Sequence, residues 1–126
     1  MISPKVYEKQ IKDLEIEGKE IIPKNKDDAI ILFDELEDLE KILEKIRYNI
    51  RMDIRVIRKN YMDGIKEIED NSKKNPKVLK NKIKEKKQLI AERDFKIAPY
   101  ESLEYTIDDY LNQIKSAKKY ISSYIS

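Results

Sequence analysis

Arginine is concentrated in one part of this 126-residue chain, at a regular spacing. Four of its five arginines follow steps of four, four and three residues: Arg47, Arg51, Arg55 and Arg58. These steps place the four side chains along one flank of a helix. A guanidinium group grips a carboxylate or a phosphate through two parallel hydrogen bonds, which the ammonium group of a lysine cannot do. The pattern therefore predicts a ladder of anion-binding groups.

Two kinds of anion fit this arginine ladder. If the second half of the chain folds back on the first, Glu92, Asp94 and Glu101 come within range, and charges beside a helix seam commonly fix the pairing register. A phosphate or an RNA backbone would suit the same groups, with the ring of Tyr48 beside them. We favour the internal ion pairs, because charged residues in such positions usually find partners within the fold.

A lysine cluster follows the turn expected near residues 71–76. Within the cluster only Glu85 opposes the charge of Lys73, Lys74, Lys77, Lys80, Lys82, Lys84, Lys86 and Lys87. These lysines point to several sides of a helix, and carboxylates at 63–70 could balance them, so a solvated surface is the favoured interpretation. The alternative is a contact with nucleic-acid phosphates, since counterion release requires only clustered charge.

Tyrosine is frequent toward the C-terminus, where it exceeds what a small core needs. Tyrosine is also enriched at protein interfaces, because its ring is apolar and its hydroxyl tolerates water. The sequence therefore offers two equal interpretations, boundary residues of the core or an interaction surface. The candidates for such a surface are Tyr105, Tyr110, Tyr120 and Tyr124.

Most familiar catalytic chemistry is missing from the sequence. There is no histidine and no cysteine, which removes the commonest general base, the commonest metal ligand and the thiolate nucleophile. Carboxylates at 34–38 and at Asp108 and Asp109 could approach one another, but lysines would lie alongside them. We therefore predict no catalytic residues, no metal site and no cofactor, and expect that the protein is not an enzyme.

The elements that must position these residues are long helices. Charged residues make up 41% of the chain, and it contains two glycines, a composition typical of all-α proteins with long helices. Apolar residues recur at steps of three and four from Leu36 to Ile68, which predicts one helix over about 27–70 with a seam facing a partner helix. At its start, four apolar residues in a row at 30–33 indicate an end enclosed on several sides.

Two further helices complete the predicted architecture. Ser3 and Pro4 signal the start of a short helix over about 4–17, with Gly18 as its stop. Asn75 and Pro76 signal the start of another over about 76–124, which either kinks or breaks near Pro99. Asn25 or Asp27 should cap the long helix.

The sequence thus predicts a single all-α domain, 1–126, built as a long antiparallel, coiled-coil-like helical hairpin. The short N-terminal helix should pack at its open end as part of a helical bundle, and a turn at 72–74 would place Phe33 near Gln113. Net charge is only +2, from 27 basic and 25 acidic residues, so no global field points to a polyanion partner.

We expect a non-enzymatic structural or protein–protein interaction module that binds a protein partner or itself as a homo-oligomer. The alternative is an arm that binds RNA or DNA through the lysine cluster and the arginine ladder. No run of residues is apolar enough for a membrane span, and Met1-Ile2-Ser3-Pro4 lacks the apolar core of a signal peptide, so a cytoplasmic location is expected.

Overall fold

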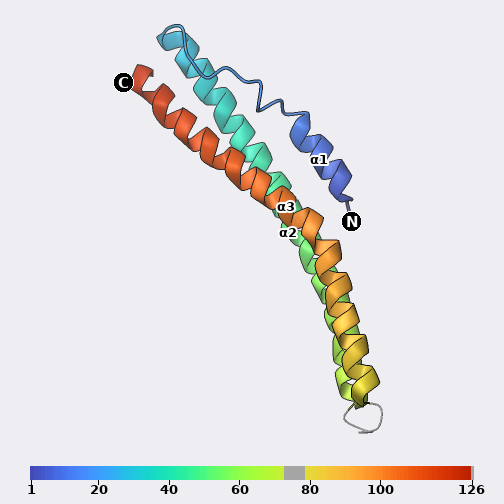
Figure 1. The fold of residues 1–126 in the computed structure, drawn as a ribbon. Helices are drawn as coiled ribbons and strands as arrows, with labels where there is room; N and C mark the ends of the chain where they lie inside the picture. The colour runs from blue at the N-terminus through green and yellow to red at the C-terminus, as the bar shows by residue number, and fades with distance from the viewer. Residues whose placement is uncertain (73–78, 126) are drawn as a thin grey trace. The chain divides into compact units, whose positions relative to one another are not determined.

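Three α-helices make up the computed structural model, which describes residues 1–72 and 79–125. They are α1 (Pro4–Lys12), α2 (Lys26–Ser72) and α3 (Leu79–Ile125), and the described residues contain no strand (Figure 1). The helices group into two units, one formed by residues 1–50 and 102–126 (unit 1) and the other by residues 51–101 (unit 2). In each unit α2 and α3 run antiparallel, so the predicted all-α helical hairpin is confirmed.

The start of α2 is fixed by side chains that satisfy free backbone groups. The Asn25 side-chain oxygen accepts a hydrogen bond of 2.8 Å from the backbone N–H of Asp28. The Asp28 carboxylate accepts one, also of 2.8 Å, from the backbone N–H of Lys24. Such reciprocal bonds occupy donors that have no partner in the first turn of a helix. The sequence predicted either Asn25 or Asp27 as the N-cap of this helix, and the structure shows that Asn25 is the cap.

Unit 1 holds most of the buried core. Tyr7 and Ile11 of α1 are buried, and the three helices lie side by side in this unit (Figure 1). Buried apolar residues of α2 and α3 in this unit are Ala29, Leu36, Leu43, Ile46, Ile50, Ile107, Leu111, Ile114, Ala117 and Ile121. Since α1 has only nine residues, too few for a stable isolated helix, its packing through Tyr7 and Ile11 maintains it.

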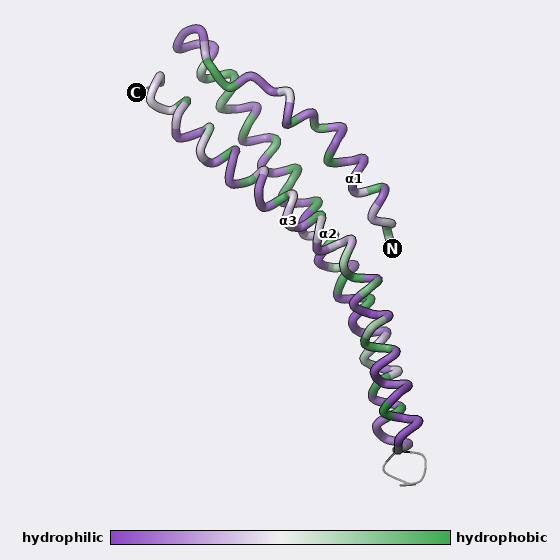
Figure 2. Tube along the Cα trace, viewed as in Figure 1, coloured by the Kyte–Doolittle hydropathy of each residue, from purple (hydrophilic) through white to green (hydrophobic). Residues whose placement is uncertain are grey.

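Unit 2 contains two helices and a thinner core. Its buried residues are Ile54 and Ile57 on α2 and Ile97 and Tyr100 on α3, all on the predicted seam. Further along the seam, Tyr61, Ile65 and Ile68 are only half-buried. The alternation of apolar and polar residues along both helices is visible in Figure 2. A two-helix layer has no third element to cover its outer faces.

The hairpin register differs from the expected one. Phe33 lies under Lys118, with the lysine Nζ 5.0 Å from the ring centroid, five residues beyond the predicted neighbour Gln113. Helix α2 also continues to Ser72, two residues past its predicted end, and the described part of α3 begins at Leu79. The helix start expected at 76 lies outside the described residues.

Two local expectations are wrong at the N-terminal side. The first helix ends at Lys12 instead of 17, and Glu15 adopts a left-handed φ of 54° well before Gly18. Leaving the helix early brings Glu17 to the hydroxyl of Tyr110, at 2.9 Å. At the start of α2, Ile30 and Ile31 are exposed, so this end is not enclosed on all sides.

The structure decides the open question at Pro99. Helix α3 continues through this proline without interruption from Leu79 to Ile125. Pro99 itself is exposed, while Ile97 and Tyr100 beside it are buried in the seam. Packing of the seam residues therefore holds a helical backbone at a position where proline lacks the N–H donor.

Candidate functional site

The arginine ladder does not act as one unit. Arg47, in unit 1, donates a hydrogen bond of 2.9 Å from Nη1 to the Asp108 carboxylate across the hairpin. Both side chains are partly exposed, so the pair has only a modest effect on stability and acts chiefly on register. The internal ion pairing favoured from the sequence thus occurs at Arg47, with Asp108 in place of the expected carboxylates.

The three remaining arginines lie in unit 2 and are exposed. Arg51 has an interaction within the protein. Within the described part of the chain, Arg55 and Arg58 form no ion pair. Asp94, one of the expected partners, instead accepts a hydrogen bond of 3.1 Å from its neighbour Arg93. Two arginines of the ladder therefore remain available to an external anion.

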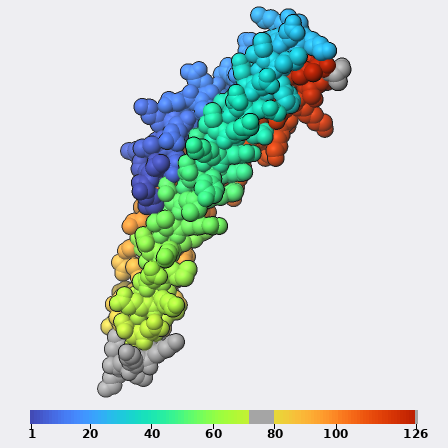
Figure 3. Space-filling view, turned by 180° about the vertical axis from the view of Figure 1, so that it is seen from behind, coloured from blue at the N-terminus to red at the C-terminus, as the bar shows by residue number. Residues whose placement is uncertain are grey.

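Apolar side chains lie among these arginines on the outer side of α2. Met52 and Val56 are one turn apart and exposed, and Met62 follows on the same side. We call the outward surface of Met52, Arg55, Val56, Arg58, Lys59 and Met62 the basic face. Figure 3 shows the side of unit 2 that α2 forms. Exposed apolar groups next to unpaired cations are typical of a docking surface, not of a merely solvated helix.

A second exposed surface lies on the outer side of α3 in the same unit. Phe95 is 82% exposed, the most exposed of the large hydrophobic side chains described. Ala91, Glu92 and Ala98 lie within one turn of it, and all are exposed. We call the surface formed by Ala91, Glu92, Phe95 and Ala98 the Phe95 face. Small residues beside an exposed ring leave room for another helix to approach.

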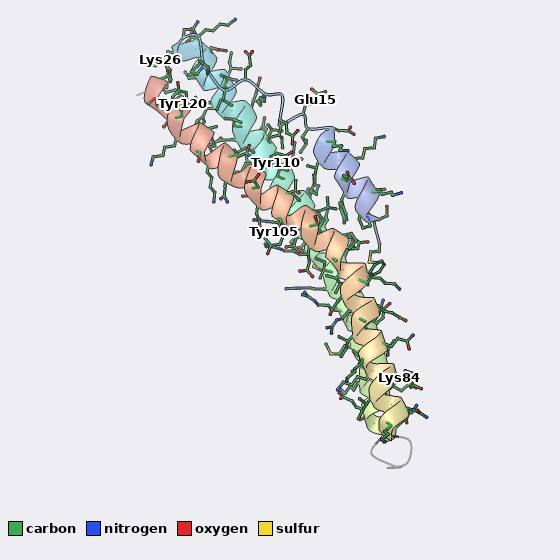
Figure 4. The ribbon with its side chains drawn as sticks, in the orientation of Figure 1. Glu15, Lys26, Lys84, Tyr105, Tyr110 and Tyr120 are labelled. Carbon is green, nitrogen blue, oxygen red and sulfur yellow. The ribbon has the colours of Figure 1, made fainter. Side chains whose placement is uncertain are left out.

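The lysine cluster is divided between internal partners and solvent. Lys82 pairs with Glu85 at 3.5 Å, and Lys86 pairs with Glu69 of α2. The other described members of the cluster, Lys80, Lys84 and Lys87, are exposed, and Lys84 is labelled in Figure 4. Lys73, Lys74 and Lys77 lie outside the described residues. The expected balance by carboxylates of the facing helix is therefore present at Glu69.

The candidate tyrosines differ in their surroundings. Tyr105 is exposed, whereas Tyr110 is half-buried and donates its hydroxyl proton to the Glu17 carboxylate (Figure 4). Near the end of α3, Tyr120 and Tyr124 form an edge-to-face pair with ring centroids 5.5 Å apart and hydroxyls joined by a hydrogen bond of 2.9 Å. These four tyrosines therefore do not present one continuous surface.

We expect stability to fall at high pH through the tyrosines that pack inside the fold. Burial, and then the hydrogen bond to Glu17, raises the pKa of Tyr110 in the folded protein. A raised pKa stabilises the fold below the unfolded value, and this contribution is lost as pH rises above about 10. Denaturant unfolding at increasing pH should show this fall, and Tyr110→Phe should reduce it. The exposed control Tyr105→Phe should leave the fall unchanged, and equal behaviour of the two variants would contradict the assignment.

Of the carboxylates considered for a metal site, Glu37 pairs with a lysine, which it shares with Glu40, and Asp108 pairs with Arg47. The Nζ atom of Lys118 lies 3.6 Å from Glu37 Oε1 and 3.7 Å from Glu40 Oε2. Across residues 1–72 and 79–125, no three acidic, histidine or cysteine side chains gather closely enough to hold a metal ion. The same residues include no helix with the length and apolar character needed to cross a membrane.

The sequence interpretation identified the arginines but missed the apolar residues beside them. Met52, Val56 and Met62 lie off the seam, where the periodicity of the core gives no reason for large apolar side chains. Phe95 likewise falls between the seam positions of α3. On α3 the signal that could have revealed the second surface is the spacing of Ala91, Phe95 and Ala98 by four and three residues. On α2 the signal is weaker, because only Met52 and Val56 are one turn apart.

Known proteins add nothing to this geometry. Comparisons with protein-family models, with curated proteins and with solved structures find no match to this chain.

Proposed function

We propose that this protein is a protein–protein interaction module that binds through the outward faces of unit 2. The observation that carries the proposal is that Met52, Val56 and Phe95 are exposed on helices that bury a separate apolar seam at Ile54, Ile57, Ile97 and Tyr100. A helix needs one apolar stripe to join its own fold, and a second stripe serves another contact. A cytoplasmic location, expected from the sequence, stays a prediction.

Charge supports the same proposal. Over residues 51–62 there are four basic side chains and one acidic side chain, Asp53. Arginine and methionine are both enriched in protein interfaces, where guanidinium groups surround an apolar centre. Burying the exposed apolar area would contribute about 25 cal/mol per Å² removed from water. Arg55 and Arg58, which form no ion pair with a described residue, would add orientation and specificity.

Two valines of nearly equal exposure allow a matched test of this function. Val56, on the basic face, is 46% exposed, and Val6, on α1, is 48% exposed. Protein captured by the tagged chain in cells that express it should be lost with Val56→Asp and retained with Val6→Asp. Both variants should keep the helical circular dichroism of the parent, because neither position is buried. Capture that is equal for the two variants would overturn the proposed function.

The nucleic-acid alternative has weaker support. Three of the ten residues on which it depended, Arg47, Lys82 and Lys86, are engaged with carboxylates of the chain itself. Lys80, Lys84 and Lys87 remain exposed and would suffice for a weak contact with phosphates. Binding of RNA that weakens steeply with salt and is lost in Lys80→Glu/Lys84→Glu/Lys87→Glu would favour this alternative over the interaction module.

A further inference from the structure

We propose that the outer side of α3 in unit 2 binds an amphipathic helix of a partner protein, acidic along one half and apolar along the other. The residues that would form this contact recur at steps of three and four, and all of them are exposed. We call them the α3 stripe: Lys80, Lys84, Lys87, Ala91, Phe95 and Ala98. The inference rests on the proposed interaction function, and it specifies the chemistry of the partner for one of the two outward faces.

The six positions of the α3 stripe lie on one side of the helix. An α-helix has about 3.6 residues per turn, so steps of four, three, four, four and three return each side chain to nearly the same side. The seam residues Ile97 and Tyr100 lie on another side and are buried. At 1.5 Å per residue, the stripe is about 27 Å long from Lys80 to Ala98, which is enough to contact a helix of about 18 residues.

The first half of the α3 stripe is basic and has no counterion among the described residues. Lys80, Lys84 and Lys87 form no ion pair with any of them. The described positions one turn before or after each of these lysines contain no acidic residue. Glu85, which is close in sequence, pairs with Lys82 at 3.5 Å. Three ammonium groups within about 10 Å along the helix axis therefore favour a partner with carboxylates at a similar spacing.

The second half of the α3 stripe belongs to the Phe95 face and is apolar. Phe95 is 82% exposed, and Ala91 and Ala98 lie one turn before and after it. Small side chains on both sides of a ring allow a second helix to come close while the ring packs between its side chains. Aromatic residues are common anchors of protein contacts, because burying the ring removes a large apolar surface from water.

This arrangement favours a protein helix over a nucleic acid. A single-stranded nucleic acid binds along a continuous basic path with several rings on which bases stack, whereas the α3 stripe has one ring and no basic residue beyond Lys87. The two basic residues nearest the ring lie off the stripe: Arg93 binds Asp94 at 3.1 Å, and Lys96 lies over the Tyr61 ring. A helix that is acidic and then apolar matches both halves, as in other contacts made by amphipathic helices.

A designed peptide tests this inference with the full-length chain. The probe is a fluorescent helix of about 18 residues, with glutamates along one side of its first half and leucines along the same side of its second half. Its fluorescence anisotropy should rise on addition of the natural protein, and added salt should weaken the binding. Lys80→Glu/Lys84→Glu/Lys87→Glu should weaken binding about tenfold or more, because the substituted side chains repel the glutamates of the peptide.

The control for this charge reversal changes the net charge by the same amount elsewhere. Lys41→Glu/Lys115→Glu/Lys119→Glu replaces three exposed lysines outside the α3 stripe and should bind the peptide as the natural protein does. Both triple variants should keep the helical circular dichroism of the parent, because none of the six positions is buried.

The apolar half is tested with a matched pair of aromatic residues. Phe95→Ala should weaken binding of the same peptide about tenfold, because it removes the ring that packs against the leucines. Tyr48, on α2, is also an exposed ring, at 63%, and it lies outside the α3 stripe. Tyr48→Ala should therefore leave the affinity unchanged.

Exchange of charge gives the decisive result. A second peptide, with lysines in place of the glutamates, should bind Lys80→Glu/Lys84→Glu/Lys87→Glu and should not bind the natural protein, because opposite charges again face each other.

The inference is overturned if the glutamate peptide does not bind the natural protein, or if it binds the two triple variants equally. Tighter binding of RNA or duplex DNA than of the peptide, lost in Lys80→Glu/Lys84→Glu/Lys87→Glu, would assign the lysines to nucleic acid and would also overturn it. The comparison of Val56→Asp with Val6→Asp decides the broader function separately, because Val56 lies on α2, outside the α3 stripe.

Discussion

Replacing Leu43 with alanine should lower the free energy of unfolding by about 2–5 kcal/mol. Leu43 is 0% exposed and lies on the α2 seam in the core of unit 1. Truncation removes apolar contacts and leaves a cavity that the surrounding helices fill only partly. Since domains of this size are stabilised by about 5–15 kcal/mol, the loss would be a large part of the total.

The neighbouring residue provides a matched control for this prediction. Ile42 precedes Leu43 on the same helix but is 44% exposed. Ile42→Ala should change the free energy of unfolding by only about 0.5 kcal/mol. Urea titrations of the two variants, followed by circular dichroism, measure the difference. Similar losses for both substitutions would show that the seam does not face the core as described.

Replacing Pro99 with alanine should raise the free energy of unfolding by about 1–3 kcal/mol. Helix α3 continues through this proline, which cannot donate a hydrogen bond to the carbonyl of Phe95 four residues before it. Alanine restores the donor and removes the clash of the ring with the preceding turn. The gain is reduced by about 0.4–1 kcal/mol, because proline also restricts the unfolded chain.

The control for Pro99 is another exposed position of the same helix. Ser102→Ala changes only helix propensity and should stabilise by about 0.5 kcal/mol. In urea titrations, Pro99→Ala should shift the midpoint upward without changing the slope, since the surface exposed on unfolding stays the same. A midpoint at or below that of the parent would mean that proline at position 99 favours the packing of the seam, and would contradict the prediction.

The helices could be predicted from the sequence because their signals are local. Spacing of apolar residues by three and four identified the α2 seam, and Leu36, Leu43, Ile46, Ile50 and Ile54 are indeed buried. The boundaries of α2 fall within two residues of the expected 27–70. A helix depends on contacts within a turn or two, so residue spacing and end signals carry most of the information.

The register could not be predicted in the same way. A seam that repeats every three or four residues buries a similar apolar area in several registers. The contacts between the helices identify the register that is adopted, in which Phe33 meets Lys118 and Arg47 meets Asp108. The contact between Glu17 and Tyr110, which follows the early end of α1, likewise joins distant residues and is contained in no local pattern.

The residues of the candidate site divide in the same way, into features that local sequence patterns reveal and features that depend on contacts between distant residues. By itself, the sequence determined that the fold is helical, that one apolar seam is buried, and that arginine gathers beside this seam. Only the tertiary structure decided that Arg47 is paired, that Arg55 and Arg58 form no ion pair with any residue of 1–72 or 79–125, and that Phe95 is left in water. The spacing of apolar residues shows which side of a helix is buried along its whole length. Whether a given side chain is paired or exposed depends on which residue of another helix lies opposite it.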